Sequence, residues 1–259
     1  MQGVTKYYPN GETDLRAFLA GNNILLFSQD VPLATQKIKN AIHKGEASEQ
    51  MLEYSVKKIL AAKYDAGLSH FEPIQEEGVT ADLNRLTDRF KRRTALAALT
   101  LVKDQHRIIS KLQSGKPTVA YLNINGLGAS QLQSELQRNF PNLHSQAMPA
   151  GSSADKALDF VQRNQDEVLI VGIHNLTFYP GSGDDYGLTA AQLTLIKRLA
   201  QEEKVIFLVF GNAYLMKYLC DAPCVIVAYE DDKFTEDAAF RVLTGKIKAR
   251  GTLPVTACD

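Results

Sequence analysis

Apolar residues in the last two thirds of the chain follow two different periods. Five short runs are apolar and rich in β-branched residues, as buried strands are, at 99–103, 118–123, 168–173, 205–210 and 225–229. Between these runs, apolar positions recur every three or four residues, which is the helical period. Buried strands that alternate with helices predict a mostly parallel sheet covered on both faces. Residues 87–259 are therefore predicted to form a three-layer αβα sandwich.

Several polar residues stand where helices of this sandwich should begin. Thr189 and Gln192 have the spacing of a capping box, in front of a helix predicted over 189–202. Asn212 and Thr235 are expected to cap two further helices, around 214–219 and 236–243. A helix is also predicted from residue 87 or 88 to 98, and it leads into the first strand.

The first 68 residues predict one strand and two helices. The run 24–27 is apolar without alternation, which is typical of a strand buried on both faces. Asp30 and Ser48 are expected to cap the helices, which end near Gly45 and Gly67. One such strand cannot close a core alone, and residues 1–70 offer it no neighbouring strand. Strands from elsewhere should therefore complete this part.

Three segments follow from this pattern. Residues 1–68 form the first part, and 87–259 form the α/β sandwich. Between them, 69–86 contains Pro73, Gly78 and several charged residues with little periodicity, which favours a linker over the surface.

Charge and hydropathy exclude some partners. The chain has 29 Lys and Arg against 29 Asp and Glu, so no net field draws it to nucleic acid or anionic lipid. The basic cluster at 89–93 lacks interleaved aromatic residues and is interpreted as a solvated helix face. The longest apolar runs have six residues, too few to cross a bilayer, and the first 25 residues do not resemble a signal peptide. We expect no nucleic-acid partner and no membrane segment.

The three cysteines do not form a recognisable framework. Cys220 and Cys224 are spaced C-x3-C without a nearby histidine, and Cys258 is left over. This fits neither a zinc ligand set nor a disulfide scaffold, so we predict buried or incidental free thiols. No metal site and no cofactor are predicted.

Candidate chemistry is sought in the loops after the strands, because ligands of such sheets gather at the carboxyl ends. Gly126 and Gly128 could cradle an anion, but Gln131 replaces the third glycine of a dinucleotide fingerprint, so a tight turn is favoured. The loop 174–187 is long, polar and aromatic. His174 is either a general acid or base or a hydrogen-bonded loop residue. The adjacent pair at 184–185 is interpreted as turn-forming.

Five fragments of the chain carry a family resemblance. They are AFLAGNNILLFS at 17–28, ILAAKYDAGL at 59–68, ALTLVK at 98–103, FGNAYL at 210–215 and GTLPV at 251–255. In this order they resemble glycoside hydrolase family 3, the first two its catalytic (β/α)8 barrel and the others its C-terminal α/β domain. The chain departs from the family pattern at Asn23, usually Asp, and at Ala213, usually Pro. The resemblance implies that 1–68 is the last strand and helices of a truncated barrel.

The resemblance also implies which catalytic groups are missing. The family's nucleophilic Asp would stand just before Met1. Its exo-glucosidases take the general acid from a Glu after Val-Gly, where this chain has Ile173. Its β-N-acetylglucosaminidases use a His on a barrel loop, which would lie upstream. Ile173 thus favours a retaining exo-β-N-acetylglucosaminidase parent, active in carbohydrate or cell-wall glycan metabolism. This C-terminal portion has no catalytic residue, is expected to be inactive alone, and has the missing N-terminal barrel portion as its partner.

The resemblance places certain residues near the glycan, which would bind only to the intact enzyme. These substrate-adjacent residues are Met1, Gly3, Ser28, His174 and Asn175. A bacterial, exported or cell-envelope parent is compatible with the pattern, and the compartment is left open. Two alternatives remain: a free-standing module that binds a small ligand or sugar at the loops of Gly126 and His174, or a scaffold piece whose strand 24–27 docks onto a partner chain.

Overall fold

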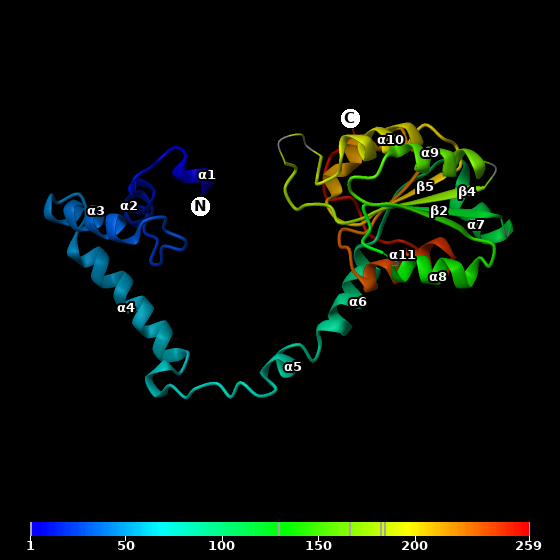
Figure 1. The fold of residues 1–259 in the computed structure, drawn as a ribbon. Helices are drawn as coiled ribbons and strands as arrows, with labels where there is room; N and C mark the ends of the chain where they lie inside the picture. Colours follow the sequence, from blue (N-terminus) through cyan, green and yellow to red (C-terminus); the bar gives the residue numbers. More distant parts are fainter. Residues whose placement is uncertain are drawn as a thin grey trace. The chain divides into compact units, whose positions relative to one another are not determined.

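The computed structural model describes residues 2–115, 117–128, 130–165, 167–181, 183 and 185–258. The chain divides into two compact units, with the division between Gly78 and Val79. Figure 1 shows the helices of the first unit and the sheet of the second. The predicted linker 69–86 stays a prediction; this stretch contains the short helix α5 (Val79–Leu83).

The first unit is helical. It consists of α1 (Gln2–Thr5), α2 (Glu12–Leu19), α3 (Val31–His43), α4 (Glu49–Asp65) and the 3-10 turn η1 (Leu68–His70). Both predicted caps are confirmed, because Asp30 accepts from the Leu33 amide and Ser48 from the Met51 amide. Among the described residues of this unit, Phe18, Ala41 and Ala47 form a small buried apolar cluster, and Ala34 is buried as well.

The strand predicted at 24–27 is wrong for this structure. The segment has no regular secondary structure, and Ile24, Leu26 and Phe27 are 69%, 69% and 80% exposed. None of residues 2–78 forms a strand, so this part of the chain offers the segment no neighbouring strand to pair with. An apolar run of strand length becomes a strand only where neighbouring strands exist.

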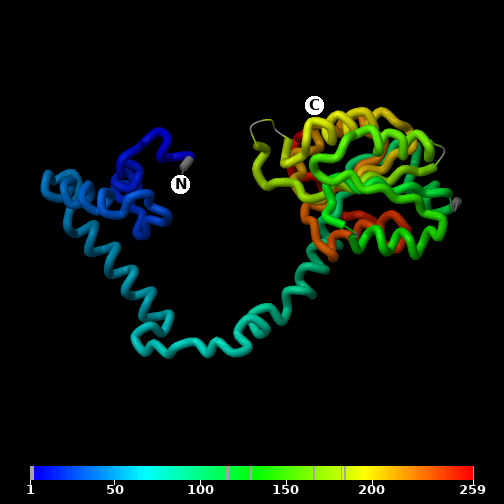
Figure 2. Tube along the Cα trace, viewed as in Figure 1, coloured from blue at the N-terminus to red at the C-terminus, as the bar shows by residue number. Residues whose placement is uncertain are grey.

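The second unit contains a six-stranded sheet, and the predicted α/β sandwich is confirmed. Figure 2 follows the course of the chain through this unit, which ends in red. The strands are β1 (Thr100–Asp104), β2 (Val119–Ile124), β3 (His144–Met148), β4 (Val168–Ile173), β5 (Val205–Val209) and β6 (Cys224–Val227). Their spatial order is β1-β6-β5-β4-β2-β3, and β1 alone is antiparallel to its neighbour.

Helices cover both faces of the sheet (Figure 1). On one face lie α6 (Thr87–Ala98), α7 (Ile108–Gly115), α8 (Gln131–Asn139) and α11 (Lys233–Leu243). On the other face lie α9 (Ala154–Arg163), α10 (Ala190–Leu199) and the 3-10 helix η3 (Ala213–Tyr218). The remaining 3-10 turn, η2 (Gln105–Arg107), leads into α7. No helix within the described part of the chain is long and apolar enough to cross a membrane.

Most predicted caps of this unit are confirmed, and one is corrected. Thr189 and Gln192 form the capping box of α10, and Asn212 caps η3. Thr235 is not the cap of α11, because Asp232 caps it and Thr235 completes the box from inside the helix. The threonine is an equally good cap by residue type, so the pattern could not separate the two positions.

The cysteine prediction is wrong for two of the three residues. Cys220 and Cys258 form a disulfide across 38 positions of sequence, with Cα atoms 5.6 Å apart. Cys224 is a free buried thiol on β6, as predicted. The bond depends on the C-terminal segment folding back over the unit, where the Gly251 amide donates to the Leu99 carbonyl. The spacing of the cysteines along the sequence could not predict this contact.

Candidate functional site

The carboxyl ends of the parallel strands place four loops at one edge of the sheet. These loops, here called the edge loops, are 125–130 after β2, 174–189 after β4, 210–212 after β5 and 228–232 after β6. Asn125, Asn175 and Tyr229 have φ angles of 63°, 50° and 67°. Residues other than glycine seldom adopt this left-handed backbone conformation, and those that do are concentrated at functional sites.

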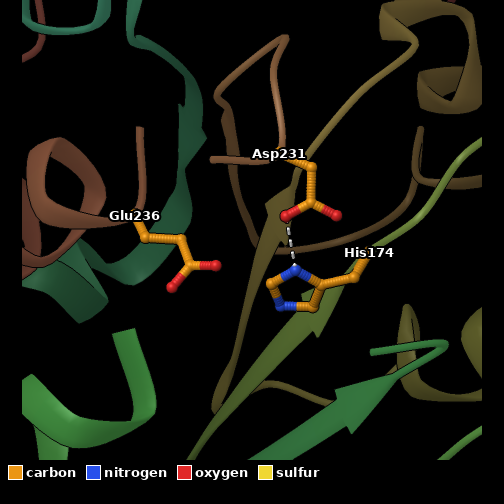
Figure 3. A group of neighbouring side chains, drawn as sticks. All are labelled: His174, Asp231 and Glu236. Carbon is orange, nitrogen blue, oxygen red and sulfur yellow. Dashed lines mark hydrogen bonds and ion pairs between the residues drawn. The ribbon is translucent and has the colours of Figure 1, made fainter. Parts of the chain in front are cut away.

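His174 lies at the centre of this edge and is buried, with 3% of its surface exposed. Its Nδ1 lies 2.9 Å from Asp231 Oδ1 (Figure 3). Its Nε2 lies 3.1 Å from the Tyr121 hydroxyl. Because a carboxylate only accepts, Nδ1 donates to Asp231, and in the neutral ring Nε2 then accepts from the Tyr121 hydroxyl. The ring stacks on Phe210, with centroids 4.6 Å apart. A Cβ at Gly172 would come within 2.7 Å of Nε2, so glycine makes this arrangement possible.

Asp231 and two asparagines join three of the edge loops. Asp231 Oδ2 accepts from the Asn175 amide at 2.7 Å. The Asn175 side chain donates to the Asn125 carbonyl at 2.7 Å, and the Asn125 side chain donates to the His174 carbonyl at 3.1 Å. These bonds satisfy backbone groups of Asn125, His174 and Asn175 and hold the loops together. Both ring nitrogens of His174 are hydrogen-bonded within the protein, as expected for a hydrogen-bonded loop residue.

Two buried polar side chains, Tyr121 and Glu236, lie near His174. Burial raises the pKa of Tyr121 above its ordinary value, and nearby Glu236 and Asp231 add to this rise while a hydrogen bond with Ser130 opposes it. Tyr121 therefore stays a neutral phenol that can donate to His174. Glu236 is buried and accepts from the Leu132 amide at 2.7 Å, at the start of α8. A carboxylate is favourable at a helix N-terminus.

His174, Asp231 and Glu236 also form a group of potential metal ligands. One ligand atom of each lies within 4.8 Å of the others, and Figure 3 shows Glu236 reaching toward the histidine from α11. Each of the three residues is already hydrogen-bonded to the protein. These hydrogen bonds account for the positions of the three residues, and we derive no metal chemistry from them.

Asp232, next to this cluster, provides a pH-dependent prediction. Partial burial acts to raise the pKa of Asp232, but hydrogen bonds from the Thr235 and Phe234 amides and from Lys91 outweigh it and hold the pKa below its ordinary value. We expect Asp232→Ala to lower the free energy of unfolding by about 1 kcal/mol at pH 7. Because the folded-state pKa is lowered, the charge-dependent part of this contribution is present above pH ~4 and is lost as the pH falls through the folded-state value.

Urea unfolding at a series of pH values measures this difference. The curves for the parent chain and Asp232→Ala should approach each other in acid. Asp159→Ala, at an exposed position of α9, is the control and should show no such convergence. A difference for Asp232→Ala that grows toward low pH would contradict the assignment.

Exposed apolar side chains project from the edge loops and from the start of η3. Leu127, Phe178, Tyr179 and Tyr214 are 92%, 83%, 76% and 52% exposed. The Asn212 side chain donates to the Phe178 carbonyl at 2.9 Å, which ties the loop 174–189 to the start of η3. We call these four residues the apolar rim. Sequence reasoning noted the loop as aromatic but did not select these residues.

The predicted substrate-adjacent residues fall in different places. His174 and Asn175 are brought together at the edge of the second unit. Gly3 lies in α1 and Ser28 in the segment before α3, both in the first unit. Met1 lies outside the described residues. Proximity of any of these residues to a sugar stays a prediction.

Comparison with known proteins identifies the family. The model of the glycosyl hydrolase family 3 C-terminal domain matches residues 28–259. The chain therefore belongs to this family, as the five sequence fragments predict. No curated protein sequence matches the chain.

Solved structures with a similar fold include a family 3 β-N-acetylglucosaminidase, a β-glucoside phosphorylase and a β-glucosidase. A glycoside hydrolase family 3 β-N-acetylglucosaminidase from Paenibacillus sp. str. FPU-7 has 20% identity and a TM-score of 0.67, covering 99% of this chain and 49% of that one. The β-glucoside phosphorylase BglX has 17% identity and a TM-score of 0.71, covering 98% and 47%. A β-glucosidase from Listeria innocua has 17% identity and a TM-score of 0.64, covering 92% and 36%. The chain spans about half the length of the first two structures. At these identities the likeness shows the fold alone.

Proposed function

We propose that this chain is the C-terminal portion of a retaining exo-β-N-acetylglucosaminidase and that it depends on an N-terminal barrel portion for catalysis. The family match and the half-length coverage of the Paenibacillus enzyme support this reading. In this proposal the chain contributes neither the nucleophile nor the acid/base. Its edge loops form part of the wall of the sugar pocket.

The observation that carries the substrate proposal is Ile173. This residue ends β4 and is fully buried, at the position where the exo-glucosidase pattern has its acidic residue. An aliphatic side chain cannot transfer a proton. His174, the next residue, uses both ring nitrogens within the protein. A glucosidase mechanism that takes its acid from this loop is thus unsupported, and the acid/base is assigned to the barrel portion.

Retaining hydrolysis explains why the chain should be inactive alone. The reaction needs a nucleophile on one side of the glycosidic bond and an acid/base on the other. In this proposal the apolar rim instead covers apolar faces of the glycan, while the network of His174, Asp231 and Asn175 keeps the rim in place. Ligand pockets commonly combine such apolar walls with a few fixed polar groups.

The test is turnover of chromogenic glycosides by the purified chain. We expect no hydrolysis of a β-N-acetylglucosaminide, a β-glucoside or a β-xyloside above the buffer rate. Asp231→Asn and Asp185→Asn serve as controls for contaminating activity, since a trace contaminant is unaffected by either substitution. Turnover that either substitution abolishes would overturn the proposal, because a side chain of this chain would then perform the chemistry.

A further inference from the structure

The C-terminal residues 249–258, here called the strap, follow α11 without regular secondary structure. At its start, the Gly251 amide donates to the Leu99 carbonyl at 3.0 Å. A Cβ at Gly251 would lie 2.0 Å from the Ala98 carbonyl oxygen, so the strap runs directly against the backbone before β1. Leu253 and Ala257 pack on the core beneath α9, α10 and η3. The strap therefore covers apolar surface although few backbone hydrogen bonds hold it.

The disulfide is the covalent attachment of this strap. Cys258 is exposed, and Cys220 is half-buried, just after the end of η3. The Cα separation of 5.6 Å lies within the range that disulfides adopt. Cys224 cannot exchange with this bond readily, because it is fully buried in β6 and burial raises the pKa of its thiol. Cys220 and Cys258 are thus a defined and reachable pair.

We propose that the Cys220–Cys258 disulfide is a redox-sensitive latch that holds the strap against η3, and that the chain operates in an oxidising compartment. This inference is independent of the proposed glycosidase role. Disulfides persist in oxidising environments, whereas cytosolic dithiols keep most cysteine pairs reduced. An exposed bond is the kind that reductants reach first.

Opening the latch requires a dithiol reductant. One thiolate of the reductant attacks the exposed sulfur of Cys258, a mixed disulfide forms, and the sulfur of Cys220 leaves and takes up a proton. The second thiol of the reductant then displaces Cys258, which also becomes a thiol. Two electrons pass to the protein, and the reductant becomes a disulfide.

The latch is linked to the edge loops through η3. Cys220 follows the end of this helix, and Asn212 caps its beginning while holding the Phe178 carbonyl. Leu215 and Met216 are buried between these two points. Reduction should therefore loosen the strap most and the loop carrying Phe178 and Tyr179 to a smaller degree.

Thiol labelling and hydrogen exchange test the latch. In the denatured chain without reductant, alkylation should label Cys224 only. In the native chain, dithiothreitol should expose Cys220 and Cys258 to alkylation and raise amide exchange in 251–257 about tenfold or more, with a smaller rise in 174–179. Cys258→Ser should show the raised exchange without reductant and no response to it, and Cys224→Ala should behave as the parent chain does.

Two results would overturn the proposal. The first is alkylation of Cys220 and Cys258 without reductant in chain prepared under oxidising conditions, which would mean that the bond does not form. The second is unchanged exchange in 251–257 after complete reduction, which would mean that the bond holds nothing. The reduced parent chain keeps the second result measurable even where Cys258→Ser does not fold.

Discussion

His174→Ala is expected to lower the free energy of unfolding of the second unit by about 3 kcal/mol. The substitution removes a buried ring that stacks on Phe210 and leaves a cavity between the sheet and α11. It also leaves the fully buried Tyr121 hydroxyl without the acceptor on His174. Asp231 loses its hydrogen bond with the imidazole, while its hydrogen bond with the Asn175 amide is not removed. The cavity and the lost hydrogen bond of the Tyr121 hydroxyl each contribute to the loss.

Urea unfolding followed by circular dichroism measures this loss. His144→Ala is the matched control, because His144 also pairs with a carboxylate, Glu167, but its side chain is 60% exposed. Its removal should cost about 0.5 kcal/mol or less. A loss below about 1 kcal/mol for His174→Ala would contradict the role given to the buried network.

Limited proteolysis is expected to remove the first unit at least a hundredfold faster than it cleaves the second. The first unit buries few apolar side chains, and on α4 Leu52, Val56 and Leu60 are 42%, 43% and 58% exposed. With so little buried area, local opening should cost little free energy. The second unit has two extensive apolar clusters, one on each face of its sheet, and should resist cleavage.

Two exposed helical sites allow a direct comparison with trypsin. Lys58 lies in α4 of the first unit, and Arg198 lies in α10 of the second. Cleavage after Lys58 should precede cleavage after Arg198 and leave a resistant fragment that starts close to α6. Equal cleavage rates at the two sites would show that the first unit is as stable as the second, and that its exposed apolar residues need no partner.

The sheet was predictable where local pattern and burial agree. The strand runs that became β4 and β5 are apolar throughout, and the run that became β2 is apolar except for Asn123, because all three are buried on both faces. The edge strand β3 has the sequence HSQAM and was missed, since most of it faces solvent and carries no apolar pattern. The apolar run 24–27 has the pattern of a buried strand but does not form one. A strand depends on neighbouring strands, and the local sequence does not show whether they are present.

The site was predictable only in part. His174 and Asn175 stand out as the first polar residues after a buried strand. Their partners Tyr121 and Asp231 are separated from His174 by 53 and 57 positions, and no local spacing connects them. A signal for Asp231 did exist, because it follows the last apolar run as an acidic residue near a strand end. Tyr121 carried none, since an aromatic residue within a buried strand is typical of a core.

The geometry also changes the interpretation of His174. The sequence leaves His174 as either an acid or base or a hydrogen-bonded loop residue, and in the structure it is buried with both ring nitrogens hydrogen-bonded. In the proposed function the reacting groups therefore come from the barrel portion. That separation between a supporting wall and the reacting groups is the central claim of the account.

Intact-mass spectrometry with a slowly hydrolysed fluorinated glycosyl donor tests this claim most directly. A retaining enzyme forms a covalent glycosyl intermediate on its nucleophile, and a slow donor lets it accumulate. The account predicts that the mass of the chain stays unchanged after prolonged incubation with such a donor. A mass increase of one sugar, mapped to a carboxylate within residues 2–258, would contradict it.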